Sequence, residues 1–421
     1  MVNEQQADTV IESLGRAARQ AVGALAVTPA DLRNRALREA AAGLRAAVAT
    51  VLAANRLDLE QAGQRGISGA MLDRLRLDEA RVEGIARGLE QVAELPDPVG
   101  RELARWRQPN GLDIARVAVP IGVIGVIYES RPNVTADAAA LCLKAGNAVI
   151  LRGGSEAVHS NRALHRVLVD GVRAAGLPGA AVQMVPDQDR AMVGALLRAH
   201  KYIDVIVPRG GRSLVERIQN DARVPVFAHL DGNNHLYWHA SADPAMAIEV
   251  IVNAKLRRTG ICGALETLLI DRACLGELPR LVDVLVERGC ELRGDAAACA
   301  ADARIVAASE QDWATEYLDA ILAIATVDSA DEAIAHISNW GSGHTDGVLA
   351  ADAAVIEDFL ARVDSAIVIA NASTQFADGG EFGFGAEIGI ATGRLHARGP
   401  VGVEQLTTFK YQLRGSGQTR P

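Results

Sequence analysis

Apolar side chains in the first hundred residues recur at the spacing of amphipathic helices. This pattern predicts helices over residues 11–26, 28–62 and 78–94. Thr28 stands where an N-cap belongs, and Pro29 follows at a helical position that tolerates proline. The chain is therefore expected to begin with a helical lead-in.

From residue 117 onward, short runs rich in Val and Ile alternate with helical stretches, which is typical of βαβ units on a parallel sheet. The predicted strands cover residues 123–128, 148–151, 181–185, 205–207, 226–230, 266–270, 347–350 and 366–370. The predicted helices cover residues 136–144, 157–175, 189–200, 213–221, 243–256, 278–288, 331–338 and 353–363. These form two parallel-sheet α/β domains. Before them, two short segments flank Pro109-Asn110-Gly111 and predict a β-hairpin over residues 103–119.

Composition narrows the classes of protein and partner. A chain of 421 residues, 49% of them hydrophobic, predicts two or three domains with large cores. The net charge of -9, without a long basic run, disfavours nucleic acid and anionic membranes as partners. The most apolar stretch, residues 117–128, is too short to span a bilayer. The N-terminus lacks the features of a signal peptide, so a cytoplasmic location is expected.

Glycine and arginine follow two of the predicted strands, where α/β folds place their sites. Arg152 precedes Gly153-Gly154, and Arg209 precedes Gly210-Gly211. Each segment fits either a solvated strand end or a cradle for an anionic cofactor, and the residues alone leave both open. His336 and His344 are the nearest thing to a pair of metal ligands, but a structural or substrate-contacting role is favoured, and no metal site is predicted.

Five widely spread cysteines favour reduced thiols over disulfides. Most are expected to be small buried apolar residues, as in the alanine-rich segment around Cys142. Cys262 differs because Arg257, Arg258 and Gly260 precede it. Cationic neighbours lower the pKa of a thiol and raise its thiolate fraction, so Cys262 is the candidate nucleophile.

Several segments carry a resemblance to a known family. They include Tyr128-Glu-Ser-Arg-Pro-Asn-Val-Thr135, His229-Leu-Asp-Gly232, His336-Ile-Ser-Asn-Trp-Gly-Ser-Gly-His-Thr-Asp346, Cys262-Gly-Ala-Leu-Glu-Thr-Leu-Leu269 and Gly380-Glu-Phe-Gly-Phe-Gly385. Over nearly the whole chain, with these segments in the expected order along it, the sequence resembles the γ-glutamyl phosphate reductase family, a branch of the aldehyde dehydrogenase superfamily. Asn234 departs from the pattern, because the family is expected to have cysteine there.

The resemblance implies an aldehyde-dehydrogenase-like α/β fold with a small β oligomerisation arm. An NADPH-binding domain would comprise residues 1–102 and 120–232 with 376–393, and a catalytic domain residues 233–375. Residues 103–119 and 394–421 would form the oligomerisation arm and tail. The implied activity is NADPH-dependent reduction of L-glutamyl 5-phosphate to L-glutamate 5-semialdehyde and phosphate in proline biosynthesis, by a homo-oligomer with a possible functional link to glutamate 5-kinase.

By the same resemblance, Cys262 forms a thioester with the substrate and Asn133 helps to stabilise the oxyanion. The implied cofactor-binding residues are Arg152, Gly153, Gly154, Ser155, Pro208, Arg209, Gly210, Gly211, Glu381 and Phe382. Two alternatives stay open, namely a related dehydrogenase that hydrolyses its thioester or uses another acyl phosphate, and a non-catalytic binding protein. Hydrolytic members of the superfamily carry a glutamate upstream of the cysteine, where this chain has Asp231, and Glu249 lies within a predicted helix.

Overall fold

The computed structural model describes residues 2–67 and 69–420, which divide into two compact units. The first unit comprises the residues up to Ala228 together with 383–389 and those from Val401 onward. The second comprises residues 229–382 and 390–400. The division thus falls close to the expected boundary after residue 232. Of the predicted arm and tail, 103–119 and 394–421, the part from Val401 onward and residues 103–119 group with the first unit, whereas residues 394–400 group with the second.

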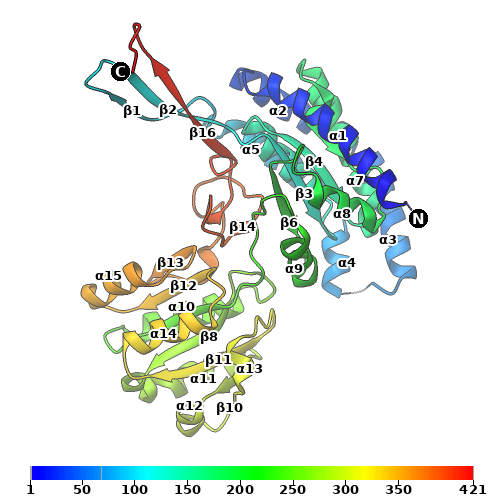
Figure 1. Ribbon diagram of the computed structural model, residues 1–421. Coiled ribbons are helices and arrows are strands. Elements are labelled where there is room, and N and C mark those ends of the chain that lie inside the picture. Colours follow the sequence, from blue (N-terminus) through cyan, green and yellow to red (C-terminus); the bar gives the residue numbers. More distant parts are fainter. Residues whose placement is uncertain (1, 68, 421) are drawn as a thin grey trace. The chain divides into compact units, whose positions relative to one another are not determined.

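Five helices open the first unit (Figure 1): α1 (Glu4–Leu25), α2 (Ala30–Ala46), α3 (Val48–Gln64), α4 (Gly69–Leu75) and α5 (Glu79–Glu94). The single helix expected over residues 28–62 is wrong, because Ala47 leaves the helical conformation with φ −99° and ψ 9° and divides it into α2 and α3. The predicted cap is also wrong. The Thr28 hydroxyl donates to the Ala24 carbonyl of α1 (2.8 Å), and Pro29 itself is the N-cap of α2.

A four-stranded parallel sheet in the order β5-β4-β3-β6 forms the centre of this unit. Its strands are β3 (Val123–Tyr128), β4 (Ala148–Gly153), β5 (Val182–Met184) and β6 (Val205–Arg209). Its helices are α6 (Val134–Lys144), α7 (Val158–Ala174), α8 (Arg190–Arg198) and α9 (Arg212–Asp221). The strand expected over residues 226–230 is wrong. Val226 makes an isolated bridge to Ile206, and the chain then leaves this unit after Ala228.

The second unit holds a seven-stranded parallel sheet in the order β10-β9-β11-β8-β7-β12-β13. Its strands are β7 (Asn234–Trp238), β8 (Leu265–Asp271), β9 (Glu291–Gly294), β10 (Val306–Ala307), β11 (Ile321–Val327), β12 (Thr345–Leu349) and β13 (Ile367–Ala370). Its helices are α10 (Pro244–Leu256), α11 (Leu278–Glu287), α12 (Ala296–Ala301), α13 (Glu310–Trp313), α14 (Ala330–Trp340) and α15 (Ala353–Arg362). A short antiparallel pair, β14 (Ile390–Ala391) and β15 (Gly399–Pro400), completes the unit.

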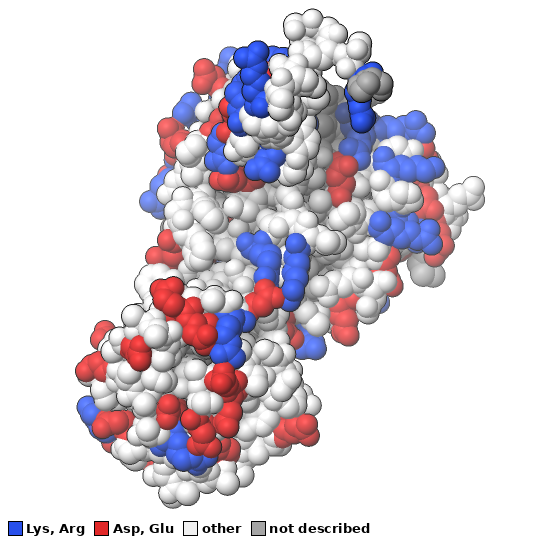
Figure 2. Space-filling view, turned by 60° about the vertical axis from the view of Figure 1, so that its left-hand side comes forward, with Lys and Arg blue, Asp and Glu red and all other residues white. Residues whose placement is uncertain are grey.

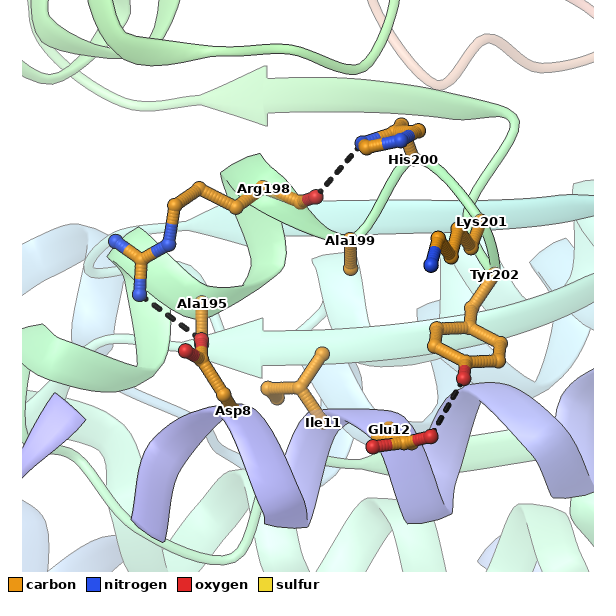
Figure 3. A pocket seen from close by; sticks show the side chains of 9 residues that line it. All are labelled: Asp8, Ile11, Glu12, Ala195, Arg198, Ala199, His200, Lys201 and Tyr202. Carbon is orange, nitrogen blue, oxygen red and sulfur yellow. Dashed lines mark hydrogen bonds and ion pairs between the residues drawn. The ribbon is translucent and has the colours of Figure 1, made fainter. Parts of the chain in front are cut away.

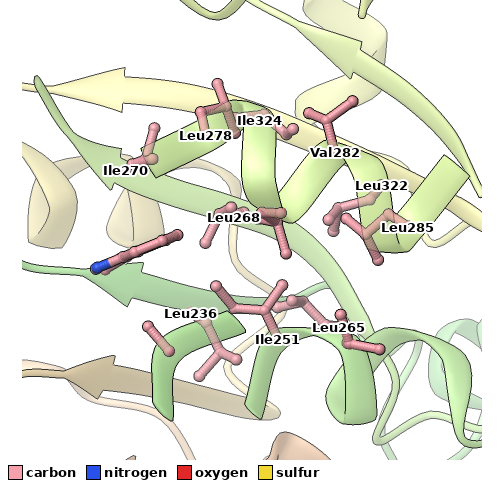
Figure 4. Packing of buried hydrophobic residues seen from close by; sticks show 14 of the residues in the cluster. Leu236, Ile251, Leu265, Leu268, Ile270, Leu278, Val282, Leu285, Leu322 and Ile324 are labelled. Carbon is pink, nitrogen blue, oxygen red and sulfur yellow. The ribbon is translucent and has the colours of Figure 1, made fainter. Parts of the chain in front are cut away.

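Two clusters of buried apolar side chains pack against this sheet, one with the helices α14 and α15 and the other with α10 and α11. Buried Leu and Ile side chains of β7, β8 and β11 meet those of α10 and α11 there (Figure 4), among them Leu236, Leu268, Ile324, Ile251 and Leu285. The burial of this apolar surface holds α10 and β8 in place. The short loop that joins α10 to β8 is therefore anchored at both ends, and it carries Cys262.

The predicted hairpin is present as β1 (Glu102–Arg107) and β2 (Asp113–Pro120), and the C-terminal strand β16 (Thr407–Arg414) pairs with β2. All three strands are antiparallel, in the order β1-β2-β16.

On the face of the molecule drawn in Figure 2, acidic and basic side chains intermingle. No helix within the described residues has the length and apolar character to cross a membrane.

Candidate active site

The Cys262 loop is fixed by a buried asparagine on β7. The Asn234 side-chain amide donates to the carbonyl oxygens of Cys262 and Ala264, both at 2.7 Å. Its own oxygen accepts the backbone N–H of Thr345 at 3.1 Å, which ties the loop to β12. Asn234 stands where the family is expected to have cysteine. Its side chain connects β7, β12 and the Cys262 loop by hydrogen bonds.

Gly232 packs directly against the backbone of the candidate nucleophile. A Cβ atom at this position would lie 2.1 Å from the carbonyl oxygen of Cys262 and 2.9 Å from its Cα atom. The Gly232 N–H donates to the carboxylate of Glu316 at 2.9 Å, which holds this segment in place. Only glycine allows so close an approach of two backbones.

Two histidines lie beside the half-buried Cys262 thiol. One ligand atom from each of His229, Cys262 and His344 lies within 4.8 Å of the other two, and the imidazole rings are 5.0 Å apart. His336, by contrast, packs against His235 at 5.5 Å between ring centroids. Burial lowers the pKa of His336 to about 4, so it is neutral at neutral pH. His336 and His344, the two histidines that come nearest to a pair of metal ligands in the sequence, thus lie in two different clusters.

The other cysteines fit the expectation of inert thiols. Cys142, Cys274 and Cys290 are buried, and burial raises the pKa of all three thiols, to about 11 for Cys274 and Cys290. Cys299 is half-buried, and its thiol donates to the Gly294 carbonyl at 3.5 Å. Of the five thiols, Cys262 is the one in a loop with imidazoles beside it.

A buried ion pair connects the two elements that flank the loop. The Lys255 ammonium of α10 and the Glu266 carboxylate of β8 are 2.6 Å apart, and both side chains are fully buried. Burial raises the pKa of Glu266 to about 7, against the lowering effect of Lys255. The pair fixes the end of α10 relative to the start of β8, and therefore both ends of the Cys262 loop.

Asn133, the expected oxyanion donor, belongs to the first unit, where it is the N-cap residue of α6. Its amide donates to the Asp137 carboxylate at 2.8 Å. Burial raises the pKa of Asp137 to about 6, although this hydrogen bond opposes the shift. The contact fixes the orientation of the Asn133 side chain. Its meeting with Cys262 stays a prediction, because Cys262 belongs to the second unit.

The first cofactor segment follows β4. Arg152 is half-buried, and one terminal nitrogen of its guanidinium donates to the Gln188 carbonyl at 2.8 Å. Its Nε atom is buried and has no hydrogen-bond partner among the residues that the structure describes. A Cβ atom on Gly153 would lie 2.1 Å from Nδ2 of Asn161, so close packing requires glycine there. Gly154 and Ser155 then lead into the short 3-10 helix Ser155–Ala157 that precedes α7.

The second segment follows β6, where Pro208 and Arg209 end the strand and Gly210-Gly211 lead into α9. Gly211 is the N-cap residue, and no described atom lies within 4 Å of a Cβ placed there. Backbone amides at such a helix N-terminus attract phosphate groups. Glu381 and Phe382 are exposed and belong to the second unit, so their part in a cofactor site stays a prediction.

Comparison with known proteins identifies the family. The model of the aldehyde dehydrogenase family matches residues 2–298. The chain is 60% identical to the gamma-glutamyl phosphate reductase of Paramagnetospirillum magneticum, with 100% of both chains covered. It is 62% identical to that of Novosphingobium aromaticivorans, over 99% of this chain and 97% of the relative. The chain belongs to the gamma-glutamyl phosphate reductase branch of the aldehyde dehydrogenase family.

The fold agrees with that branch. The crystal structure of the gamma-glutamyl phosphate reductase of Thermotoga maritima matches with a TM-score of 0.96 and 41% identity, over 98% of this chain and 100% of that one. The predictions of an aldehyde-dehydrogenase-like α/β fold and of an oxidoreductase in this family are therefore confirmed.

The pocket drawn in Figure 3 belongs to the first unit, whereas Cys262 belongs to the second. It is a hollow of about 320 Å³ between α1 and the segment after α8. Its polar groups satisfy one another, since Arg198 donates to Asp8 at 2.9 Å and the Tyr202 hydroxyl donates to Glu12 at 2.6 Å. A ligand would have to break these contacts, and the thiol of Cys262 belongs to the other unit.

Proposed function

We propose that this chain is an NADPH-dependent reductase of L-glutamyl 5-phosphate, which forms L-glutamate 5-semialdehyde and phosphate in proline biosynthesis. The observation that carries the proposal is the half-buried Cys262 thiol in a loop fixed at both ends, next to two imidazoles. The full-length identity of about 60% to gamma-glutamyl phosphate reductases supports the choice of substrate.

Cys262 supplies the nucleophile. Its thiolate attacks the acyl carbon, a C–S bond forms, and the C–O bond to phosphate breaks with both electrons leaving on phosphate. Asn133 and the Cys262 backbone N–H are the proposed donors to the tetrahedral oxyanion. When NADPH is bound, it supplies the hydride that reduces the thioester. The collapse of the resulting hemithioacetal returns the thiolate to Cys262 and releases the aldehyde.

Two features of the first unit fit a dinucleotide. The helix α9 begins directly after Gly210-Gly211, and its N-terminus suits a pyrophosphate, which would take the place of the Glu129 carboxylate that accepts the Gly211 N–H at 3.2 Å. The partly unsatisfied guanidinium of Arg152 suits the 2′-phosphate that distinguishes NADPH from NADH, because arginine binds phosphate through two parallel hydrogen bonds. Arg152→Ala is expected to narrow the preference for NADPH, measured as the ratio of kcat/KM for the two cofactors. Wild-type enzyme that uses both equally would contradict this role.

The nucleophile is tested by substituting two cysteines in parallel. Cys262→Ser should eliminate turnover while the fold and NADPH binding persist, because a serine hydroxyl is a much weaker nucleophile at neutral pH than a cysteine thiolate. The matched control Cys142→Ser alters a buried thiol of the first unit and should keep substantial activity. Both are compared by NADP reduction with glutamate semialdehyde and phosphate. A Cys262 variant with activity equal to that of the control would exclude the covalent mechanism.

A hydrolytic dehydrogenase is the second candidate function, and the two acids considered upstream of Cys262, Asp231 and Glu249, argue against it. A water that cleaves the thioester needs a carboxylate base. Asp231 has a shorter side chain than the glutamate of hydrolytic enzymes, and Glu249 is exposed in the middle of α10. Oxidation of the semialdehyde should therefore require inorganic phosphate. Full-rate NADPH formation in phosphate-free buffer, with free glutamate as product, would favour the hydrolytic enzyme.

The β1-β2-β16 sheet is the proposed contact between copies of the chain. It exposes the large apolar side chains Trp106, Phe409, Tyr411 and Leu413 along two edge strands, which need covering. A homo-oligomer is expected in sedimentation at micromolar concentration, and a species of only 44.4 kDa would contradict it.

We also propose a functional link to glutamate 5-kinase, which makes an unstable acyl phosphate. A cytoplasmic location is proposed as well, because a free thiol nucleophile persists in a reducing compartment.

A further inference from the structure

We propose that His229, His344 and Cys262 together form a binding site for a thiophilic divalent cation such as Zn²⁺, and that the bound cation reversibly blocks the enzyme. The three candidate ligand atoms already lie within 4.8 Å of one another. Zinc with two nitrogen ligands and one sulfur ligand at ordinary bond lengths places these atoms about 3.3–3.6 Å apart in tetrahedral geometry. Closing the cluster around a cation therefore requires shifts of about 1 Å, which side-chain rotations supply.

The hydrogen bond of the His229 imidazole fixes its tautomer. Nδ1 of His229 lies 2.8 Å from the carbonyl oxygen of Ile390. A carbonyl only accepts, so Nδ1 carries the proton and Nε2 carries the lone pair. A backbone partner of this kind is the usual support of a metal-binding histidine, because it fixes both the tautomer and the ring orientation.

His344 supplies the second, independent observation. Its side chain is fully buried, and Nδ1 lies 2.8 Å from the Thr345 hydroxyl. Its Nε2 atom is buried and has no hydrogen-bond partner among the described residues. An unsatisfied buried nitrogen beside a thiol is costly, and coordination of a cation would satisfy it.

The ligand set selects the chemical class of cation. Imidazole nitrogen and thiolate sulfur suit Zn²⁺ and Co²⁺, whereas Mg²⁺ and Ca²⁺ prefer oxygen ligands. On binding, the Cys262 thiol releases its proton to water, and the thiolate forms the metal–sulfur bond. Three protein ligands leave the fourth position to water. The inhibition, but not the binding, rests on Cys262 being the nucleophile of the proposed function.

The binding is tested on the full chain, stripped with EDTA and kept reduced without a thiol, by titration with Co²⁺. The expected result is one Co²⁺ per chain with the visible bands of tetrahedral cobalt and an ultraviolet sulfur-to-cobalt charge-transfer band. Cys262→Ser should remove the charge-transfer band, whereas the matched control Cys299→Ser, which alters another half-buried thiol of the same unit, should keep it. Thr345→Val should weaken binding by roughly 10–100-fold, as loss of a partner of a metal-binding histidine does.

Inhibition and thiol protection complete the test. Zn²⁺ should abolish turnover of the wild type, EDTA should restore it, and Zn²⁺ should protect Cys262 from alkylation as read by peptide mass spectrometry. The protection assay needs no variant, so it holds even if a substitution prevents folding. Co²⁺ without a charge-transfer band, or alkylation of Cys262 unchanged by Zn²⁺, would overturn the site. A chain that shows both signals but lacks reductase activity would retain the site and contradict the proposed function.

Discussion

Gly232→Ala should displace the nucleophile without changing any group that takes part in the chemistry. The new methyl carbon would lie 2.1 Å from the Cys262 carbonyl oxygen, 2.8 Å from its carbonyl carbon and 2.9 Å from its Cα atom, whereas ordinary contacts begin near 3.4 Å. The obstacle is backbone on both sides, held by Asn234 and Glu316, so no side-chain rotation relieves it. The backbones must separate by roughly 1 Å, and a misplacement of about 1 Å costs on the order of 100-fold in rate.

The assay compares the kcat of Gly232→Ala with that of a matched glycine substitution in the Cys262 loop. Gly260→Ala is the control, because the nearest atom to its added methyl group is the Leu318 carbonyl oxygen at 4.0 Å. Phosphate-dependent NADP reduction should fall about 100-fold for Gly232→Ala, or about 2.7 kcal/mol in activation free energy, and change little for Gly260→Ala. NADPH binding, measured by fluorescence, should persist in both. If Gly232→Ala folds and its kcat stays within a factor of two of the control, the contact between Gly232 and Cys262 does not set the geometry of the nucleophile.

Three other substitutions probe the surroundings of the site. Asn133→Ala should lower kcat by roughly 100-fold or more with less effect on KM, since removing one oxyanion donor costs about 2.7–4 kcal/mol; an unchanged kcat would remove Asn133 from the active site. The pKa of Asp137 rises from 3.8 to about 6 on folding, so the stability that it contributes is present below 3.8 and is lost as the pH rises through about 6. Asp137→Asn should therefore gain thermal stability relative to wild type across that range, and a constant difference between the two melting temperatures would refute this. Lys255→Met leaves Glu266 buried without its partner and should cost about 3–5 kcal/mol in urea unfolding at alkaline pH. The loss should shrink at pH values well below 7, where Glu266, with a pKa of about 7, takes up a proton, and equal losses at both pH values would contradict this.

The first sheet could be predicted from the sequence because most of its strands are short apolar runs rich in Val and Ile, as in Val123–Tyr128. β7 could not be predicted because it begins with Asn234 and His235, two polar residues that are fully buried and form hydrogen bonds with partners far along the chain. The prediction also lacks β9 and β11. β9 is only four residues long and two of its side chains are charged, so it does not form an apolar run. β11 is an apolar run between helical segments that the prediction does not include.

The candidate nucleophile could also be predicted, but its neighbours could not. His229 follows the crossing between units, Cys262 lies in a loop after α10, and His344 directly precedes β12. Their approach depends on the pairing of β7 with β8 on one side and with β12 on the other, and spacing along the chain carries no trace of that register. The only signal in the sequence was that all three residues occur in segments shared with the family. The arginines expected near the thiol, Arg257 and Arg258, are exposed, and Arg257 contacts Gln375 instead.

The pairing of β16 with β2 has a consequence for how this protein is made. Thr407 lies opposite Pro120 and Arg414 opposite Asp113, and the Asn147 side chain donates to the Leu406 carbonyl at 2.8 Å. During synthesis, residues up to 228 leave the ribosome before β16 has been translated. One edge of β2 therefore remains unpaired while the second unit is translated. The second unit, by contrast, needs nothing beyond residue 400. A chain that ends at residue 400 would contain every residue of the second unit but would lack β16, so the pairing of β16 with β2 is a late step in the maturation of the first unit.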